Sequence, residues 1–301
     1  NQKFKCIYCK ENKLNYKNLM KKFLYSIIII YSLIINVYAD VSDKISAKVN
    51  DYFSNLIPGN GITEVSIDLR ENNSPDFSIL AVRELEKSLT GNIFTQFSLF
   101  NTEQNNDDRV VGNLGFGKRN LSDDKLMLTG SNIFFDYDSH GNIRTSLGVE
   151  ARNAVLEFYG NYYKGLGDGP DEKVLDGYDL RFESQIPYLH WADIFYNTYK
   201  WKGVDREDVE GAKMGSEIQF TPNINLEIAY DDKKKRGIED EWYARIMFMH
   251  PPKEGPSAKD GIANTAWKEN KDMSGELLSK VKRNNKIMIE FKGSATISRT
   301  D

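Results

Sequence analysis

Residues 178–183 read YDLRFE, in which charged side chains occupy every second position and aromatic or apolar side chains the positions between them. Successive side chains of a β-strand point to opposite faces, so Leu180 and Phe182 would share one face and the charged side chains the other. An arginine that faces lipid costs about 2–4 kcal/mol at the middle of a bilayer, whereas a wet lumen accommodates it. The stretch is therefore typical of a strand in the wall of a transmembrane β-barrel.

This period of two recurs from Val65 to Phe248. It predicts an all-β fold, a transmembrane antiparallel up-and-down β-barrel of about 12 strands, each near the 9–11 residues that a tilted strand needs to cross a bilayer. Long polar connections alternate with short ones, as the external loops and periplasmic turns of outer-membrane barrels do, and a soluble β-sandwich gives no reason for this asymmetry. The second expected strand fits the alternation poorly. We expect strands at 62–71, 77–88, 92–101, 109–119, 126–137, 144–152, 154–164, 174–186, 192–202, 211–221, 224–231 and 241–250.

The same alternation assigns polar residues and several glycines of these strands to the inward face. Inward polar side chains would form a hydrogen-bonded ladder that stabilises the wall and orients the loops. These are Asn132, Asp136, Arg144, Glu150, Arg152, Glu157, Asp179, Arg181, Glu183, Glu217, Glu227 and Arg245. Inward glycines would leave space in the lumen, namely Gly115, Gly117, Gly130 and Gly148. Aromatic residues near strand ends suit interfacial girdles, namely Tyr137, Tyr162, Tyr163, Trp201, Tyr230 and Trp242.

Residues 20–39 have the anatomy of a secretory signal peptide. Two lysines precede an isoleucine-rich run that is shorter than the roughly 20 residues of an ordinary membrane span, and a small-residue pattern predicts cleavage after Ala39. Residues 1–19 would then be an untranslated or non-native leader. Because Cys6 and Cys9 lie in that leader, we assign them neither a metal site nor a redox function.

Two further segments flank the expected barrel at 61–252. Residues 40–60 carry apolar side chains at helical spacing and predict a periplasmic amphipathic helix. Residues 253–301 read as a linker, with a helix expected over 272–283 and an extended stretch over 286–292.

A series of short segments stands out along the chain: FTQF at 94–97, NLGFGKR at 113–119, GSNIFFDYD at 130–138, LGVE at 147–150, NYY at 161–163, GYDLR at 177–181, FTP at 220–222 and VKRNNKI at 281–287. Together they resemble the barrel domain of the intimin/invasin family, the inverse autotransporters. Each match is weak by itself, and their number and order make the resemblance specific.

The resemblance implies a Gram-negative outer-membrane barrel, with its N-terminus in the periplasm, that anchors a C-terminal passenger and exports it through its pore. The linker that threads the pore would include Lys280, Lys282, Arg283, Asn284 and Asn285. The implied partners are outer-membrane lipid, periplasmic chaperones and the barrel-assembly machinery. The passenger itself is expected to be absent or truncated, so cell adhesion and a host receptor are not predicted for these residues.

A passive, porin-like channel is the alternative function. Lys280, Lys282 and Arg283 argue against an open pore if they enter an acidic lumen, but a solvated basic face in the periplasm is an equally open interpretation. An outer-membrane phospholipase would need a Ser–His pair on the outer wall. The histidines fall instead in expected loops, turns or strand ends, at His140, His190 and His250. We therefore expect no enzyme, cofactor or metal, and the near balance of 44 acidic and 40 basic residues suggests no nucleic-acid partner.

Overall fold

The computed structural model describes residues 57–71, 74–104, 107–234, 240–268 and 272–292. All of them belong to one compact unit. The predicted leader, signal peptide, cleavage after Ala39 and most of the predicted amphipathic helix lie outside the described residues. Within the described part of the chain, no helix is both long and apolar enough to cross a membrane.

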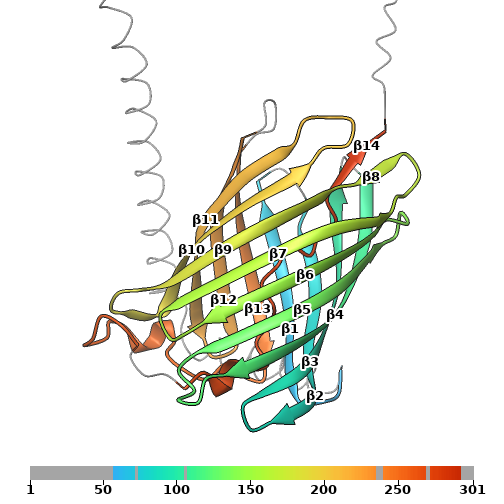
Figure 1. The fold of residues 1–301 in the computed structure, drawn as a ribbon. Coiled ribbons are helices and arrows are strands. Elements are labelled where there is room, and N and C mark those ends of the chain that lie inside the picture. The colour runs from blue at the N-terminus through green and yellow to red at the C-terminus, as the bar shows by residue number, and fades with distance from the viewer. Residues whose placement is uncertain (1–56, 72–73, 105–106, 235–239, 269–271, 293–301) are drawn as a thin grey trace, which may run out of the picture. The chain divides into compact units, whose positions relative to one another are not determined.

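In the described chain, twelve strands close into an antiparallel barrel, as predicted (Figure 1). Each wall strand pairs with the wall strands before and after it, and β1 pairs with β13 to close the sheet. Closure satisfies the backbone polar groups within a bilayer, where no water can do so. The wall strands are β1 (Gly61–Arg70), β2 (Asp76–Ser88), β3 (Gly91–Gln104), β4 (Asp107–Leu121), β5 (Leu128–Asp138), β6 (Ile143–Arg152), β7 (Leu156–Gly167), β9 (Asp176–Ile186), β10 (Leu189–Lys202), β11 (Val209–Thr221), β12 (Ile224–Lys233) and β13 (Glu241–His250).

The poor alternation of the second strand has a structural cause. The pairing of β2 with β3 shifts its register between Glu84 and Glu86. Such an irregularity inserts an unpaired residue and breaks the period of two. The amino-terminal half of β2 also departs from the alternation, because Leu80, Ala81 and Val82 are all buried. Leu80 and Val82 pack with Val281, so this strand carries apolar residues on its inner face as well.

Two short strands and two short helices complete the described structure. Strands β8 (Glu172–Val174) and β14 (Ile289–Phe291) pair antiparallel in a sheet of their own, and the 3-10 helices are η1 (Ala258–Asp260) and η2 (Met273–Glu276). The helix predicted over 272–283 is therefore wrong in type and extent, because only η2 is helical there.

The apolar residues at helical spacing in this segment contact different parts of the wall. Leu277 packs in one cluster with Leu128, whereas Val281 packs in another with Phe94 and Phe134. These contacts bury the side chains of a chain that is not helical here as well as a helix would, so tertiary packing overrides the local period.

The two ends of the barrel differ in their connections. The turn end carries Gly61, His250 and short connections such as 222–223 between β11 and β12. The loop end carries longer connections, such as 168–175 between β7 and β9 and 203–208 between β10 and β11. The two ends thus show the asymmetry that the sequence predicted.

The outer face of the wall is apolar and the inner face is buried. Exposed apolar side chains of the outer face include Leu114, Phe116, Leu147, Val149, Leu156 and Phe182. Tyr137 and Tyr162 are also exposed, as members of an interfacial girdle would be. The prediction was wrong for Tyr163 and Trp201, which are buried and pack with Met288 and Leu175. Both side chains point to the inner face of their strands. The girdle prediction rested only on their position near a strand end, which does not tell the inner face from the outer one.

Candidate functional site: a segment that threads the barrel

After β13 the chain crosses the turn end before it enters the barrel. The backbone N–H of Ala263 donates to the carbonyl of Tyr188 at 2.8 Å, and that of Met273 donates to the carbonyl of Lys125 at 2.9 Å. Tyr188 lies between β9 and β10, and Lys125 between β4 and β5, so the chain passes across the mouth. It then runs inside the barrel to β14 at the loop end (Figure 1). We name residues 277–292 the threading segment.

Two wall arginines hold the first residues of the threading segment. The Arg119 guanidinium donates to the carbonyl oxygens of Leu277 and Ser279 at 2.9 and 2.6 Å. It also pairs with Glu150 at 2.7 Å. Arg152 donates to the Ser279 hydroxyl at 2.6 Å. An extended chain does not satisfy its own backbone acceptors, and burial penalises those left unpaired, so these donors fix its path.

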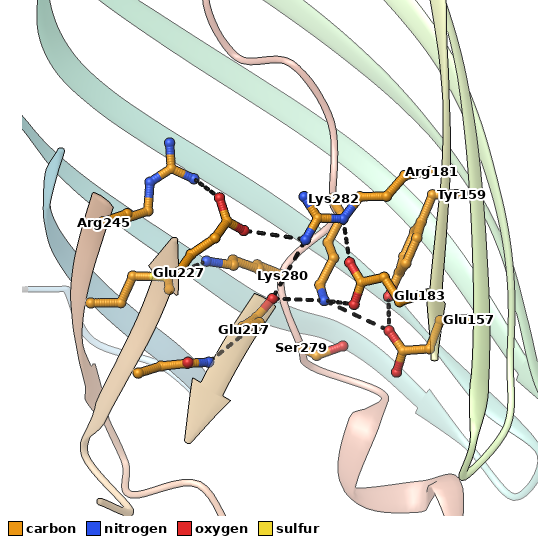
Figure 2. A network of polar contacts seen from close by, with 12 residues as sticks. Glu157, Tyr159, Arg181, Glu183, Glu217, Glu227, Arg245, Ser279, Lys280 and Lys282 are labelled. Carbon is orange, nitrogen blue, oxygen red and sulfur yellow. Dashed lines mark hydrogen bonds and ion pairs between the residues drawn. The ribbon is translucent and has the colours of Figure 1, made fainter. Parts of the chain in front are cut away.

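The next residues of the threading segment include two lysines that pair with carboxylates of the wall. Lys280 Nζ lies 2.8 Å from Glu64 Oε2 in β1. Lys282 Nζ lies 3.0 Å from Glu217 Oε2 in β11 and also contacts the carboxylate of Glu183 in β9 (Figure 2). Both lysine side chains are partly buried, and burial penalises an ammonium group without such partners, so the acidic wall and the basic segment depend on each other.

The centre of the threading segment is an arginine that faces the opposite wall. Arg283 Nη2 lies 2.7 Å from Asp136 Oδ2 in β5, and neither side chain is exposed. Arg144 in β6 pairs with the same oxygen at 2.8 Å. The Arg283 guanidinium also lies 4.3 Å from the ring centroid of Phe134, where the π face attracts a cation.

The next two residues, Asn284 and Asn285, form hydrogen bonds to the wall through their backbone groups. Arg144 donates to the carbonyl of Asn284 at 2.8 Å, and the Asn284 N–H donates to the Tyr163 hydroxyl at 2.7 Å. Asn113 donates to the carbonyl of Asn285 at 3.2 Å. Side chains of β4, β6 and β7 therefore satisfy the hydrogen-bonding groups of the backbone here, as a neighbouring strand would in a sheet.

The loop end holds the segment as it leaves the barrel. β14 pairs with β8, and the backbone N–H groups of Val204 and Asp205 each donate to the Glu290 carboxylate at 3.0 Å. Glu172 of β8 is itself fixed by Arg109 at 2.9 Å, with both side chains buried. The loops 168–175 and 203–208 thus both hold β14 in place.

A surface carboxylate supports β8 from the outside. The N–H of Val174 and the ammonium of Lys173 each donate to Asp168 at 2.9 Å. These bonds favour the ionised form and lower the pKa of Asp168.

The four predicted lumen glycines lie beside bulky neighbours. A Cβ atom on any of them would overlap a side chain from an adjacent strand, so each glycine makes room for that side chain rather than for an empty lumen. The overlapping approaches are 2.3 Å to Phe134 for Gly115, 2.3 Å to Phe94 for Gly117, 2.5 Å to Glu150 for Gly130 and 2.5 Å to Asn132 for Gly148.

Most of the predicted lumen set is buried, and it divides into two groups. Side chains that contact the threading segment are Asp136, Arg144, Arg152, Glu157, Glu183 and Glu217. Others bond within the wall: Glu150 to Arg119, Asp179 to Tyr163, Arg181 to Glu227 and Arg245 to Asp68. Asn132 is buried beside Gly148, and Glu157 and Arg245 are half-buried.

Several contacts of the threading segment were missed in the sequence. Glu64 carried no signal that set it apart from other strand residues, and Tyr163, although it lies in the resemblance segment 161–163, was assigned to the interfacial girdle. Gln96 accepts from the Val281 N–H at 2.8 Å, and Arg119 holds the first residues of the segment. Both lie in segments that carried the family resemblance, 94–97 and 113–119, which was the one available signal.

The chemistry of the described residues offers no metal centre, because no group of three or more His, Cys, Asp or Glu among them could hold an ion. A serine, a histidine and an aspartate do meet at the loop end. Ser139 Oγ lies 3.4 Å from His140 Nδ1, and His140 Nε2 lies 2.8 Å from Asp107 Oδ2.

Comparisons with known proteins agree with this geometry. The family model described as inverse autotransporter, beta-domain, matches residues 34–285. An attaching and effacing protein homolog of Escherichia coli K12 is 26% identical over 201 residues, which cover 60% of this chain and 66% of that protein. Intimin of Escherichia coli O111:H- is 24% identical over 216 residues, which cover 64% of this chain and 22% of intimin. The family and these relatives are non-enzymatic kinds of protein.

A solved chain from work on the in-meso crystallization of membrane proteins shares the fold, with a TM-score of 0.62 at 20% identity over 77% of this chain and 100% of that one. The present chain spans just under two thirds of the first relative's length and about a fifth of intimin's. A closed barrel with an apolar outer face, together with a family match over most of the sequence, leads to one conclusion. The protein belongs to the inverse autotransporter β-domain family and is a β-barrel of the bacterial outer membrane.

Proposed function

We propose that this barrel anchors a C-terminal passenger in the outer membrane and exports it through the lumen. The turn end and the N-terminus face the periplasm, and the loop end faces the outside. Outer-membrane lipid surrounds the apolar outer face. Periplasmic chaperones and the barrel-assembly machinery deliver the chain to the membrane. The passenger is the polypeptide on the C-terminal side of the threading segment.

The observation that carries this proposal is the charge pairing along the threading segment. Lys280, Lys282 and Arg283 meet carboxylates of β1, β11 and β5 respectively. Breaking a buried ion pair by removing one partner costs about 3–5 kcal/mol. Only the Arg283 pair is fully buried, whereas the side chains of Lys280 and Lys282 are partly buried. The segment is therefore favoured inside the acidic lumen chiefly through Arg283, which supports a threaded rather than an open barrel.

The alternative functions find less support. An open porin-like channel does not require cations on residues 280–283 that match carboxylates of the wall. A phospholipase would need a sheltered Ser–His pair, but the Ser139–His140 contact of 3.4 Å is longer than a normal hydrogen bond. His140 and Asp107 are also 29% and 57% exposed, so water would reach the reacting groups.

The proposal is tested by fusing a small reporter after Asp301 and asking whether intact cells display it. We expect display with the natural sequence and a marked loss with Arg283→Glu, which sets a carboxylate against Asp136. The matched control is Lys164→Glu, at an exposed position outside the lumen, which should leave display unchanged. A reporter that remains in the periplasm while the barrel is folded in the membrane would contradict export.

A further inference from the structure

The backbone of the threading segment lies against one side of the lumen. Between residues 281 and 287 its backbone groups bond to Gln96 of β3, Asn113 of β4, Arg144 of β6 and Tyr163 of β7. The Lys280 and Lys282 side chains reach across to β1 and β11. A cavity of about 550 Å³ remains on its other side, lined chiefly by residues of β1, β2 and β10 to β13. The segment therefore fills part of the cross-section and leaves part of it open.

This cavity follows β1 for most of its length. Its lining includes Glu64, Ser66, Asp68 and Arg70, which are the successive inward residues of that strand. Six residue steps of a strand cover about 20 Å, which at a strand tilt of roughly 40° spans about 15 Å of depth, about half of a bilayer's hydrocarbon core. A cavity of that length with charged walls holds water rather than vacuum, because its polar groups need partners.

A second, smaller cavity lies next to it at the turn end. Its volume is about 40 Å³, and its lining includes Lys253, Asp193 and Asn225. Glu217 lines both cavities. The Glu217 carboxylate is held there by Lys282 at 3.0 Å and by Asn225 at 2.7 Å, so this group of side chains separates the two spaces.

We infer that the two cavities form a path for water and small inorganic ions past the threading segment, with Glu217 at its narrowest point. The inference rests on the proposed function, since it needs the segment to be in the lumen. The path excludes solutes much larger than a hydrated ion, because a neck of three bonded side chains admits little else. Its conductance is small and depends on the side chain at position 217.

The test is single-channel recording of the full chain in planar bilayers bathed in potassium chloride. We expect a small steady conductance that rises several-fold in Glu217→Ala, where the neck loses its carboxylate. Glu210→Ala is the matched control, because it lies on the same strand but lines neither cavity, and it should conduct like the natural sequence. Asn225→Ala removes the other side of the neck and should also raise the conductance, which protects the test against a folding defect of one variant.

A potential measured across a salt gradient gives a second readout. Glu217→Gln removes one negative charge beside Lys282 while it keeps the size of the side chain. The reversal potential should therefore shift in the direction of greater anion selectivity. Glu210→Gln should not shift it.

The outcomes separate the two proposals. Absence of conductance in the natural sequence and in both neck variants would overturn the ion path and leave threading intact, and so would an equal rise in Glu210→Ala. A large conductance that no variant alters would mean that the lumen is open, and it would overturn the proposed function itself.

Discussion

Arg283 of the threading segment and Asp136 of β5 lie 147 positions apart in the chain, yet their side chains meet at 2.7 Å out of reach of solvent. Arg144 approaches the same carboxylate at 2.8 Å from β6. Side chains of an extended segment alternate in direction, so a slip of one residue, about 3.3 Å, would turn the arginine away from Asp136. This contact therefore sets both the depth and the rotation of the segment in the barrel.

The first prediction concerns the stability of that contact. Arg283→Ala leaves the Asp136 carboxylate with Arg144 as its one guanidinium partner, so the loss is at most the roughly 3–5 kcal/mol of a fully uncompensated buried charge. We expect a lower midpoint of thermal unfolding for the purified barrel in detergent. Lys164→Ala breaks the pair with Asp176, in which the lysine is 56% exposed, and should cost about 0–1 kcal/mol. Equal losses in the two variants would show that the buried contact does not hold the segment.

The second prediction concerns the hydroxyl that bonds the asparagine backbone. Tyr163→Phe removes the hydroxyl that accepts from the Asn284 N–H and donates to Asp179, and an unsatisfied buried polar group costs about 1–3 kcal/mol. The amide of Asn284 should also exchange its hydrogen faster. The neighbouring Tyr162 is exposed on the outer face, so Tyr162→Phe is a close control that should change neither quantity. Unchanged exchange at Asn284 in Tyr163→Phe would count against the contact.

The third prediction concerns close packing beside a glycine. A methyl group on Gly148 would lie 2.5 Å from Asn132 Oδ1 and 2.6 Å from Asn161 Oδ1. We expect Gly148→Ala to destabilise the barrel by about 1–3 kcal/mol, the usual cost of overpacking. A methyl group on Gly112 would meet nothing closer than 3.9 Å, so Gly112→Ala should be nearly neutral in the same unfolding assay. The packing argument fails if the two variants unfold alike.

The fourth prediction concerns the grip on β14 at the loop end. Arg109→Ala deprives Glu172 of its main partner and should loosen β8. The amides of Leu175 and Lys292, which bond the two short strands together, should then exchange hydrogen faster. Lys173→Ala removes only a partly exposed pair and should leave them protected. Unaltered protection in Arg109→Ala would mean that β8 holds its place without the buried pair.

The barrel was predictable because lipid outside and polar groups inside impose a period of two on every strand. Stretches such as 178–183 express that period without ambiguity, and the strand bounds in the structure follow the predicted ones closely. The period fails in β2, where the buried Leu80 and Val82 pack with Val281 and where the register shifts between Glu84 and Glu86.

The path of the threading segment was harder to predict, since it depends on contacts between residues far apart in the chain. Leu277 and Val281 lie at helical spacing, but they pack in two separate clusters of wall residues, and nothing local distinguishes that case from a helix. Arg119 and Gln96 act on backbone groups of the segment, which any sequence would present. Lys282 and Arg283 were recognisable as cations, but only the structure assigns their carboxylates.

The most direct test of the threaded barrel is the sidedness of two positions that flank the lumen. In a chain with Cys6 and Cys9 replaced by serine, Glu254→Cys and Lys292→Cys place one thiol each at exposed positions of the turn end and the loop end. Intact cells are treated with a maleimide that does not cross the outer membrane. Threading predicts that position 292 is labelled at once and that position 254 is labelled only after the outer membrane is permeabilised. Labelling of both positions from the same side would contradict it.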